Sequence, residues 1–174
     1  MKLWLLDADV IIDLLAMDTF DKLSNLHDIY AASSVIEEIE HYWKEGIMIP
    51  VDFKNKYVQK GLVKKLSAST DEIRDEVLSK LPRLRQEALH AGELESLAIL
   101  IRDDDLIFCT RDAAAIRAMP FLDLSERGIS VESLLGKSGL QRSDLKAYHT
   151  DEYHESNLTI GKQDWVLNWK QKSP

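Results

Sequence analysis

Continuous apolar runs that end in polar residues recur along the chain and predict buried strands. They lie at residues 2–8, 28–33, 106–110 and 128–131. Runs that are apolar on both faces are typical of the inner strands of parallel sheets. Between them, apolar residues recur at helical spacing over 11–26 and 34–43. This alternation predicts an α/β fold with three layers, α/β/α, around a central parallel sheet with right-handed crossovers.

Residues 44–91 interrupt this alternation. They contain only helical patterns, one over 52–66 and a second that opens with Ser69 and Glu72 as a capping box and stops at Pro82. We therefore expect a helical hairpin inserted into the domain.

The chain is expected to form one α/β domain over residues 1–140 and a C-terminal extension over 141–174. Cys109 is the only cysteine, so a disulfide framework is excluded and a reducing, cytoplasmic location is expected. No apolar stretch is long enough to cross a membrane. A net charge of −8 argues against a broad basic surface for nucleic acid, so such a substrate would need a local patch or a metal.

Acidic residues follow each predicted strand or begin the next helix. They are Asp7, Asp9, Glu37, Glu38, Glu40, Glu93, Glu95 and Asp112. Each one alone can serve as a helix cap. As a set they are expected to meet at the carboxyl edge of the sheet, where ligand sites form. Two unit charges about 4 Å apart repel by roughly 4 kcal/mol at an effective dielectric constant of 20, so a converged cluster needs a cation. Oxygen-only ligands favour Mg²⁺ or Mn²⁺ over zinc.

Four motifs, in this order, resemble those of the PIN-domain nucleases. They are "LLDADVIIDLL", "SSVIEEIE", "GELESLAIL" and "CTRDAAAIRA", and the likeness covers residues 2–136 apart from the insertion. The resemblance implies a metal-dependent ribonuclease that hydrolyses RNA phosphodiester bonds with Mg²⁺ or Mn²⁺. The catalytic, metal-binding residues that it implies are Asp7, Glu38, Glu95 and Asp112.

Some positions of the implied site stay open. Many relatives have Asn where this chain has Asp9, which we interpret as a metal ligand through water or as a neighbour of the ligands. Glu37 is an alternative to Glu38. Glu93 is an alternative to Glu95, which is preferred because small and apolar residues follow it. Thr110 is expected to hold a water or Asp112 in place.

Basic residues in the insertion form a candidate RNA-binding wall. In "KNKYVQKGLVKK", the spacing of three lysines places them on one helix face. The candidate RNA-binding residues are Lys56, Lys60, Lys64, Arg83 and Arg85. Tyr57 is expected to stack on a base. The alternative interpretation of the lysines is a solvated helix face.

Two other functional classes compete with the nuclease. One is a catalytically inert PIN-like binding module. The other is a haloacid-dehalogenase-type phosphatase, suggested by "DADVI" but disfavoured by Ile11 and by the position of "RDDDL" before a strand. Small PIN proteins often act as toxins held by an antitoxin, so an antitoxin protein and a second copy of the chain are candidate partners.

Overall fold

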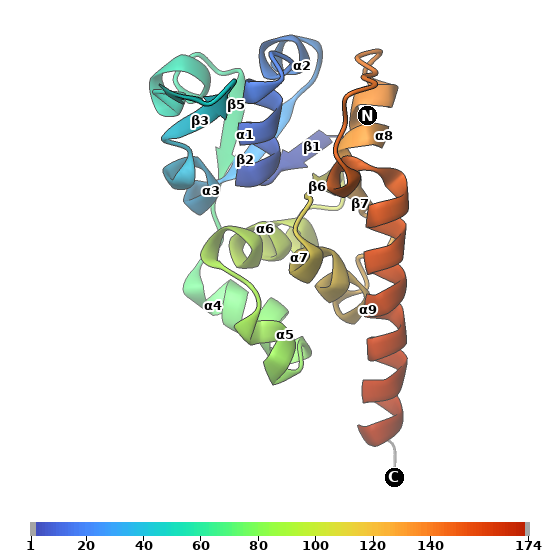
Figure 1. Ribbon diagram of the computed structural model, residues 1–174. Coiled ribbons are helices and arrows are strands. Elements are labelled where there is room, and N and C mark those ends of the chain that lie inside the picture. Colours follow the sequence, from blue (N-terminus) through green and yellow to red (C-terminus); the bar gives the residue numbers. More distant parts are fainter. Residues whose placement is uncertain (1–2, 173–174) are drawn as a thin grey trace.

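The computed structural model describes residues 3–172, which form an α/β fold around a five-stranded sheet (Figure 1). The sheet order is β5-β2-β1-β6-β7, and every neighbouring pair is parallel. Its strands are β1 (Leu3–Leu6), β2 (Ile29–Ala32), β5 (Val63–Leu66), β6 (Leu106–Cys109) and β7 (Gly128–Ile129). The predicted fold class, a parallel sheet flanked by helices, is confirmed.

Helices connect the strands and cover the sheet. They are α1 (Ala8–Ala16), α2 (Phe20–Leu26), α3 (Ser33–Glu38), α4 (Thr70–Glu72), α5 (Arg83–Glu87), α6 (Ala91–Arg102), α7 (Ala113–Ala118), α8 (Val131–Lys137) and α9 (Asp151–Lys172). Short π-helical or 3₁₀ turns lie at Lys54–Val58, Ile73–Val77, Leu78–Lys80, Met119–Leu122 and Ala147–His149. Helix α9 runs along one side of the molecule and packs against α7 (Figure 1).

The middle of the sheet forms the core because β1 consists of leucine and tryptophan residues alone. Leu5 lies beside Tyr30 of β2 and Phe108 of β6, and Leu5, Leu6 and Phe108 are inaccessible to solvent. Fully burying such a side chain contributes about 1.5–3 kcal/mol. The strand is therefore held firmly, and the residue that follows it is fixed in position.

The insertion is not purely helical, which corrects the prediction for residues 44–91. Strand β5 lies within it, joins the sheet beside β2 and forms one edge. The expected helix over 52–66 is reduced to the π-helical turn Lys54–Val58. The capping box is confirmed, because Ser69 Oγ accepts from the Glu72 amide and Glu72 Oε2 accepts from the Ser69 amide.

An antiparallel hairpin replaces the end of the helix expected over 34–43. Helix α3 ends at Glu38, and β3 (His41–Lys44) pairs with β4 (Ile47–Pro50). The turn between them has Glu45 and Gly46 at φ values of 50° and 77°, a left-handed conformation that glycine adopts without steric cost.

The C-terminal extension contains no strand within residues 141–172, as the sequence predicts. Its largest element is α9. Of the helices in the described part of the chain, none has both the length and the apolar character needed to cross a membrane.

Candidate acidic site

Asp7 lies at the carboxyl end of the central strand and is buried, with 3% of its surface exposed. It is the N-cap of α1: its Oδ1 accepts from the Ala8 amide at 2.8 Å, and its Oδ2 accepts from Thr110 Oγ1 at 2.7 Å. Burial raises the pKa of Asp7 to about 7; the bond from Thr110 opposes this rise, and the charges of Glu93 and Asp9 add to it. The carboxylate is thus held in a place that disfavours its negative charge.

Glu38 is the second acid of this group. Partial burial raises the pKa of Glu38, and the carboxylates of Glu93 and Asp9 raise it further, while His90 acts in the opposite direction. Four carboxylates from α1, α3, α6 and the end of β1 therefore act on one another. We call Asp7, Asp9, Glu38 and Glu93 the acidic cluster.

Gly92 lets α3 and α6 approach closely enough to bring two of these acids together. A Cβ atom at this position would lie 3.1 Å from Glu38 Oε1 and 3.2 Å from Val35 Cγ2. Any larger residue would push against α3. The glycine therefore allows Glu38 to lie near Glu93, the residue that follows Gly92 in the sequence. The sequence contains this signal in "GE", where a glycine precedes the acid.

Glu95, which the sequence prediction preferred over Glu93, makes its hydrogen bonds outside the acidic cluster. Its carboxylate accepts hydrogen bonds from Ser33 Oγ at 2.7 Å, from the Ser34 amide at 2.8 Å and from the Ala68 amide at 3.1 Å. Burial alone would raise the pKa of Glu95, but the bonds from Ser34, Ser33 and Ala68 outweigh it and lower the pKa. Glu95 thus ties the start of α3 to α6 and to the chain after β5, and the geometry favours Glu93 as the cluster's acid from α6.

Glu95→Gln is expected to lower the free energy of unfolding by about 1–2 kcal/mol, because a charged acceptor of buried donors is replaced by a neutral amide. Glu93→Gln is the matched control. It removes a charge that repels Asp7 but keeps a side-chain oxygen that can accept from the His90 amide, as Glu93 Oε2 does at 2.7 Å, so stability is expected to stay unchanged or rise. Urea denaturation of both variants measures this. The reverse order of stability would contradict these roles.

Thr110 and Asp112 lie beside Asp7 at the same edge of the sheet. Thr110 is buried and its hydroxyl donates to Asp7 while accepting from the Asp112 amide at 3.0 Å. Asp112 is the N-cap of α7, and its Oδ1 accepts from the Ala115 amide at 2.8 Å. Thr110 therefore fixes the Asp7 side chain and the Asp112 backbone, whereas one oxygen of the Asp112 carboxylate is used by the helix cap.

Glu37, the alternative to Glu38, points to other partners. It forms an ion pair with Lys54 at 2.8 Å, and the hydrogen bond from Lys54 lowers the pKa of Glu37. The geometry thus favours Glu38 over Glu37 as the acid from α3.

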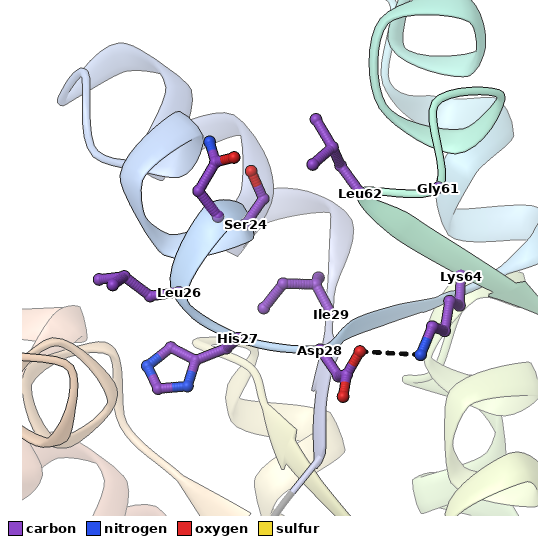
Figure 2. Close-up of a pocket in the computed structure, with 9 residues that line it drawn as sticks. Ser24, Leu26, His27, Asp28, Ile29, Gly61, Leu62 and Lys64 are labelled. Carbon is purple, nitrogen blue, oxygen red and sulfur yellow. Dashed lines mark hydrogen bonds and ion pairs between the residues drawn. The ribbon is translucent and has the colours of Figure 1, made fainter.

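The basic wall expected in the insertion is not assembled as one helix face. Lys64 lies on β5, not on a helix, and pairs with Asp28 at 2.8 Å. Figure 2 shows this pair at the rim of a hollow of about 340 Å³ lined by Leu26, His27 and neighbouring residues. The hollow lies at the amino ends of β2 and β5, the edge opposite the acidic cluster.

The remaining predicted RNA-binding residues also have other neighbours. Lys56 lies 3.6 Å from Asp21 and over the ring of Tyr57. Arg83 pairs with Glu87 on α5, and Arg85 pairs with Asp164 of α9. Lys60 lines a shallow hollow with Lys56.

Tyr57 is not available for stacking on a base. Only 1% of it is exposed, its ring packs on Phe20 and Phe53, and its hydroxyl donates to Asp21. The prediction for this residue is wrong, because the aromatic ring completes the core beneath the insertion.

The donor chemistry of the acidic cluster fits a hard divalent cation, since every donor is a carboxylate oxygen. The buried Asp7 charge, raised in energy by two neighbouring carboxylates, is the feature that a cation would stabilise. As the side chains lie, however, no three Asp, Glu, His or Cys residues within 3–172 form a group that could hold a metal ion. The cluster thus has the type of donor that magnesium and manganese prefer, but its side chains, as they lie, do not form a metal-binding group.

Comparison of the chain with protein-family models, curated proteins and solved structures finds no match. What the structure establishes is a parallel α/β fold with a five-stranded sheet. The arrangement of the side chains around Asp7 is therefore the basis for a functional proposal.

Proposed function

We propose that the protein is a ribonuclease of the PIN-domain type that hydrolyses RNA phosphodiester bonds with Mg²⁺ or Mn²⁺. The observation that carries the proposal is Asp7, a buried carboxylate at the carboxyl edge of the central strand, whose pKa is raised to about 7 by burial and, to a smaller extent, by the charges of Glu93 and Asp9. Helix capping accounts for single acids, including Glu93, whose Oε2 accepts from the His90 amide at 2.7 Å, but capping does not require the acids to lie near one another. A cation-binding site does, because the cation offsets their repulsion.

The acids of the site differ in burial, and we assign their roles accordingly. Thr110 orients the Asp7 carboxylate from below, and Ala8 holds its other oxygen. Glu38 is exposed and Glu93 is half-buried, so both are more accessible to a substrate than Asp7 is. A bound divalent ion supplies a Lewis acid that polarises a phosphoryl oxygen and lowers the pKa of water.

Cleavage of a mixed RNA pool tests the proposal. We expect wild-type protein with Mn²⁺ to cleave RNA and EDTA to abolish the cleavage. The double variant Glu38→Gln/Glu93→Gln is expected to lose at least about a hundredfold in rate, because two acids that would hold the metal are neutral. Glu37→Gln is the matched control, since Glu37 is adjacent, exposed and paired with Lys54.

The outcomes separate the functional classes. Cleavage that survives EDTA and the double variant would overturn the mechanism. Stabilisation of the fold by Mn²⁺ with no cleavage of any RNA would favour an inert metal-binding module. No stabilisation and no cleavage would reject the site altogether.

A further inference from the structure

Arg111 lies at the border of the acidic cluster and is held there from two sides. Its Nε lies 2.7 Å from Asp13 Oδ2, and its Nη2 lies 3.4 Å from Asp9 Oδ2. Its guanidinium lies over the ring of Tyr148, with Cζ 4.5 Å from the ring centroid. Tyr148 belongs to the C-terminal extension, so this segment reaches back to the site.

His149, next to Tyr148, attaches the extension to α1. Its Nδ1 accepts from the Lys146 amide, so its Nε2 carries the hydrogen and donates to Asp13 Oδ2 at 2.8 Å. His149 is only 3% exposed. The same Asp13 oxygen thus binds both His149 and Arg111, and the position of the guanidinium depends on the packing of the extension.

Arg111 keeps donor capacity that these contacts do not use. A guanidinium carries five N–H groups in a planar fork. Within residues 3–172, Asp9 and Asp13 are the carboxylates that pair with it, and its buried Nε, although close to Asp13, has no hydrogen-bond partner of suitable geometry. A quarter of the side chain is exposed. Two neighbours in sequence, Thr110 and Asp112, belong to the edge where the acids meet.

We propose that Arg111 binds a phosphate oxygen of the substrate, and that Tyr148 and Asp13 position its guanidinium for this contact. The inference rests on the proposed function and adds a phosphate-binding residue to it. A metal held by carboxylates attracts one part of an RNA backbone, and the acids nearby repel the rest. A fixed guanidinium at the border of the cluster compensates for that repulsion, and its planar fork matches the geometry of phosphate.

RNA binding, measured over a series of salt concentrations that starts at low ionic strength, tests this inference separately from cleavage. Fluorescence anisotropy of a labelled single-stranded oligoribonucleotide is measured in EDTA, with catalysis assayed separately in Mn²⁺. We expect Arg111→Gln to weaken binding about tenfold and to flatten the slope of log Kd against log salt by about 0.7, the change for one lost phosphate contact on a single strand. Arg74→Gln is the control, because Arg74 is exposed and pairs only with Asp71 and Asp75 among the described residues.

Three further variants separate positioning from charge. Arg111→Lys keeps the charge without the planar fork and is expected to bind nearly as weakly as Arg111→Gln. Tyr148→Ala is expected to weaken RNA binding. Tyr148→Phe, which keeps the aromatic ring beside Arg111, is expected to bind RNA as the wild type does. Thermal denaturation confirms that each variant folds.

The inference is overturned if Arg111→Gln leaves both the affinity and the salt slope unchanged, or if Arg111→Lys binds as tightly as wild type. Either result leaves the proposed function intact where wild-type protein cleaves RNA in an EDTA-sensitive way. Conversely, absence of cleavage by the wild type rejects the nuclease, while the salt slope still decides whether Arg111 binds phosphate.

Discussion

Asp7→Asn is expected to stabilise the fold at neutral and alkaline pH. Burial raises the pKa of Asp7 from 3.8 to about 7, so the folded protein disfavours the charge that the unfolded chain accepts. A shift of this size corresponds to a free-energy cost on the order of 4 kcal/mol above the folded pKa. Asparagine fills the same volume without a charge and removes that cost; its Nδ2 cannot accept the bond from Thr110 Oγ1, a loss of about 1 kcal/mol that offsets only part of the gain.

The pH dependence has a definite sign. Below about pH 4 both states of the wild type hold the proton, and the cost is absent. It grows as the pH rises through the interval between the two pKa values, and it is complete above about pH 7. The difference in unfolding free energy between Asp7→Asn and wild type, from urea denaturation, should therefore increase across this interval and then level off.

Asp9→Asn is the control for this prediction. The Asp9 side chain is 55% exposed, so neutralising it is expected to change stability much less than neutralising Asp7. If Asp7→Asn were less stable than wild type at about pH 8, the buried charge would not be the cost that we infer.

Mn²⁺ is expected to stabilise the folded wild type by offsetting the free-energy cost of the buried Asp7 charge. A metal that binds only the folded state stabilises it by about 2.7 kcal/mol at a concentration one hundred times its Kd. This stabilisation should be lost in Asp7→Asn and kept in Glu37→Gln. An equal shift of the melting temperature by Mn²⁺ in wild type and Asp7→Asn would place the metal elsewhere.

Much of the sheet could be predicted from sequence because its central strands are apolar on both faces. The pattern identified β1, β2 and β6, and the parallel arrangement then placed Asp7 and Glu38 at one edge. Strand β5 was missed because it contains Lys64 and Lys65. An edge strand has one hydrogen-bonding side open to solvent and tolerates such residues. The helical spacing of Lys64 with Lys56 and Lys60 was therefore misleading.

The choice between Glu93 and Glu95 could not be made from the sequence of α6. The two residues lie on different sides of the helix and flank the same apolar stripe. Contacts with other segments distinguish the two residues. The Ser33 hydroxyl and the Ser34 amide, at the start of α3, donate to Glu95, whereas Gly92 leaves room for Glu38 beside Glu93. Such contacts depend on how helices pack, which a single sequence does not report.

The contact between α9 and α7 depends on Gly161, and Gly161→Ala is expected to disrupt it. A Cβ atom there would lie 2.5 Å from the Arg117 carbonyl oxygen and 2.8 Å from its Cα, both backbone atoms of α7. Backbone does not rotate away as a side chain does, so the helices must separate. One turn earlier, Asn157 accepts from Arg117 Nε at 2.8 Å, and this bond would be strained as well.

We expect Gly161→Ala to lower the free energy of unfolding by about 3 kcal/mol, which is a fall of roughly 6–12 °C in melting temperature. Gly136→Ala in α8 is the matched control, since a Cβ atom there has no neighbour within 4 Å. Alanine favours helix over glycine by up to about 1 kcal/mol, so the control should be slightly more stable than wild type. If both variants gained stability, helix propensity would outweigh packing, and α9 would not be held against α7 by close backbone contact. Loss of stability at Gly161 alone would show that the extension is held against the domain at Gly161 as well as at Tyr148 and His149.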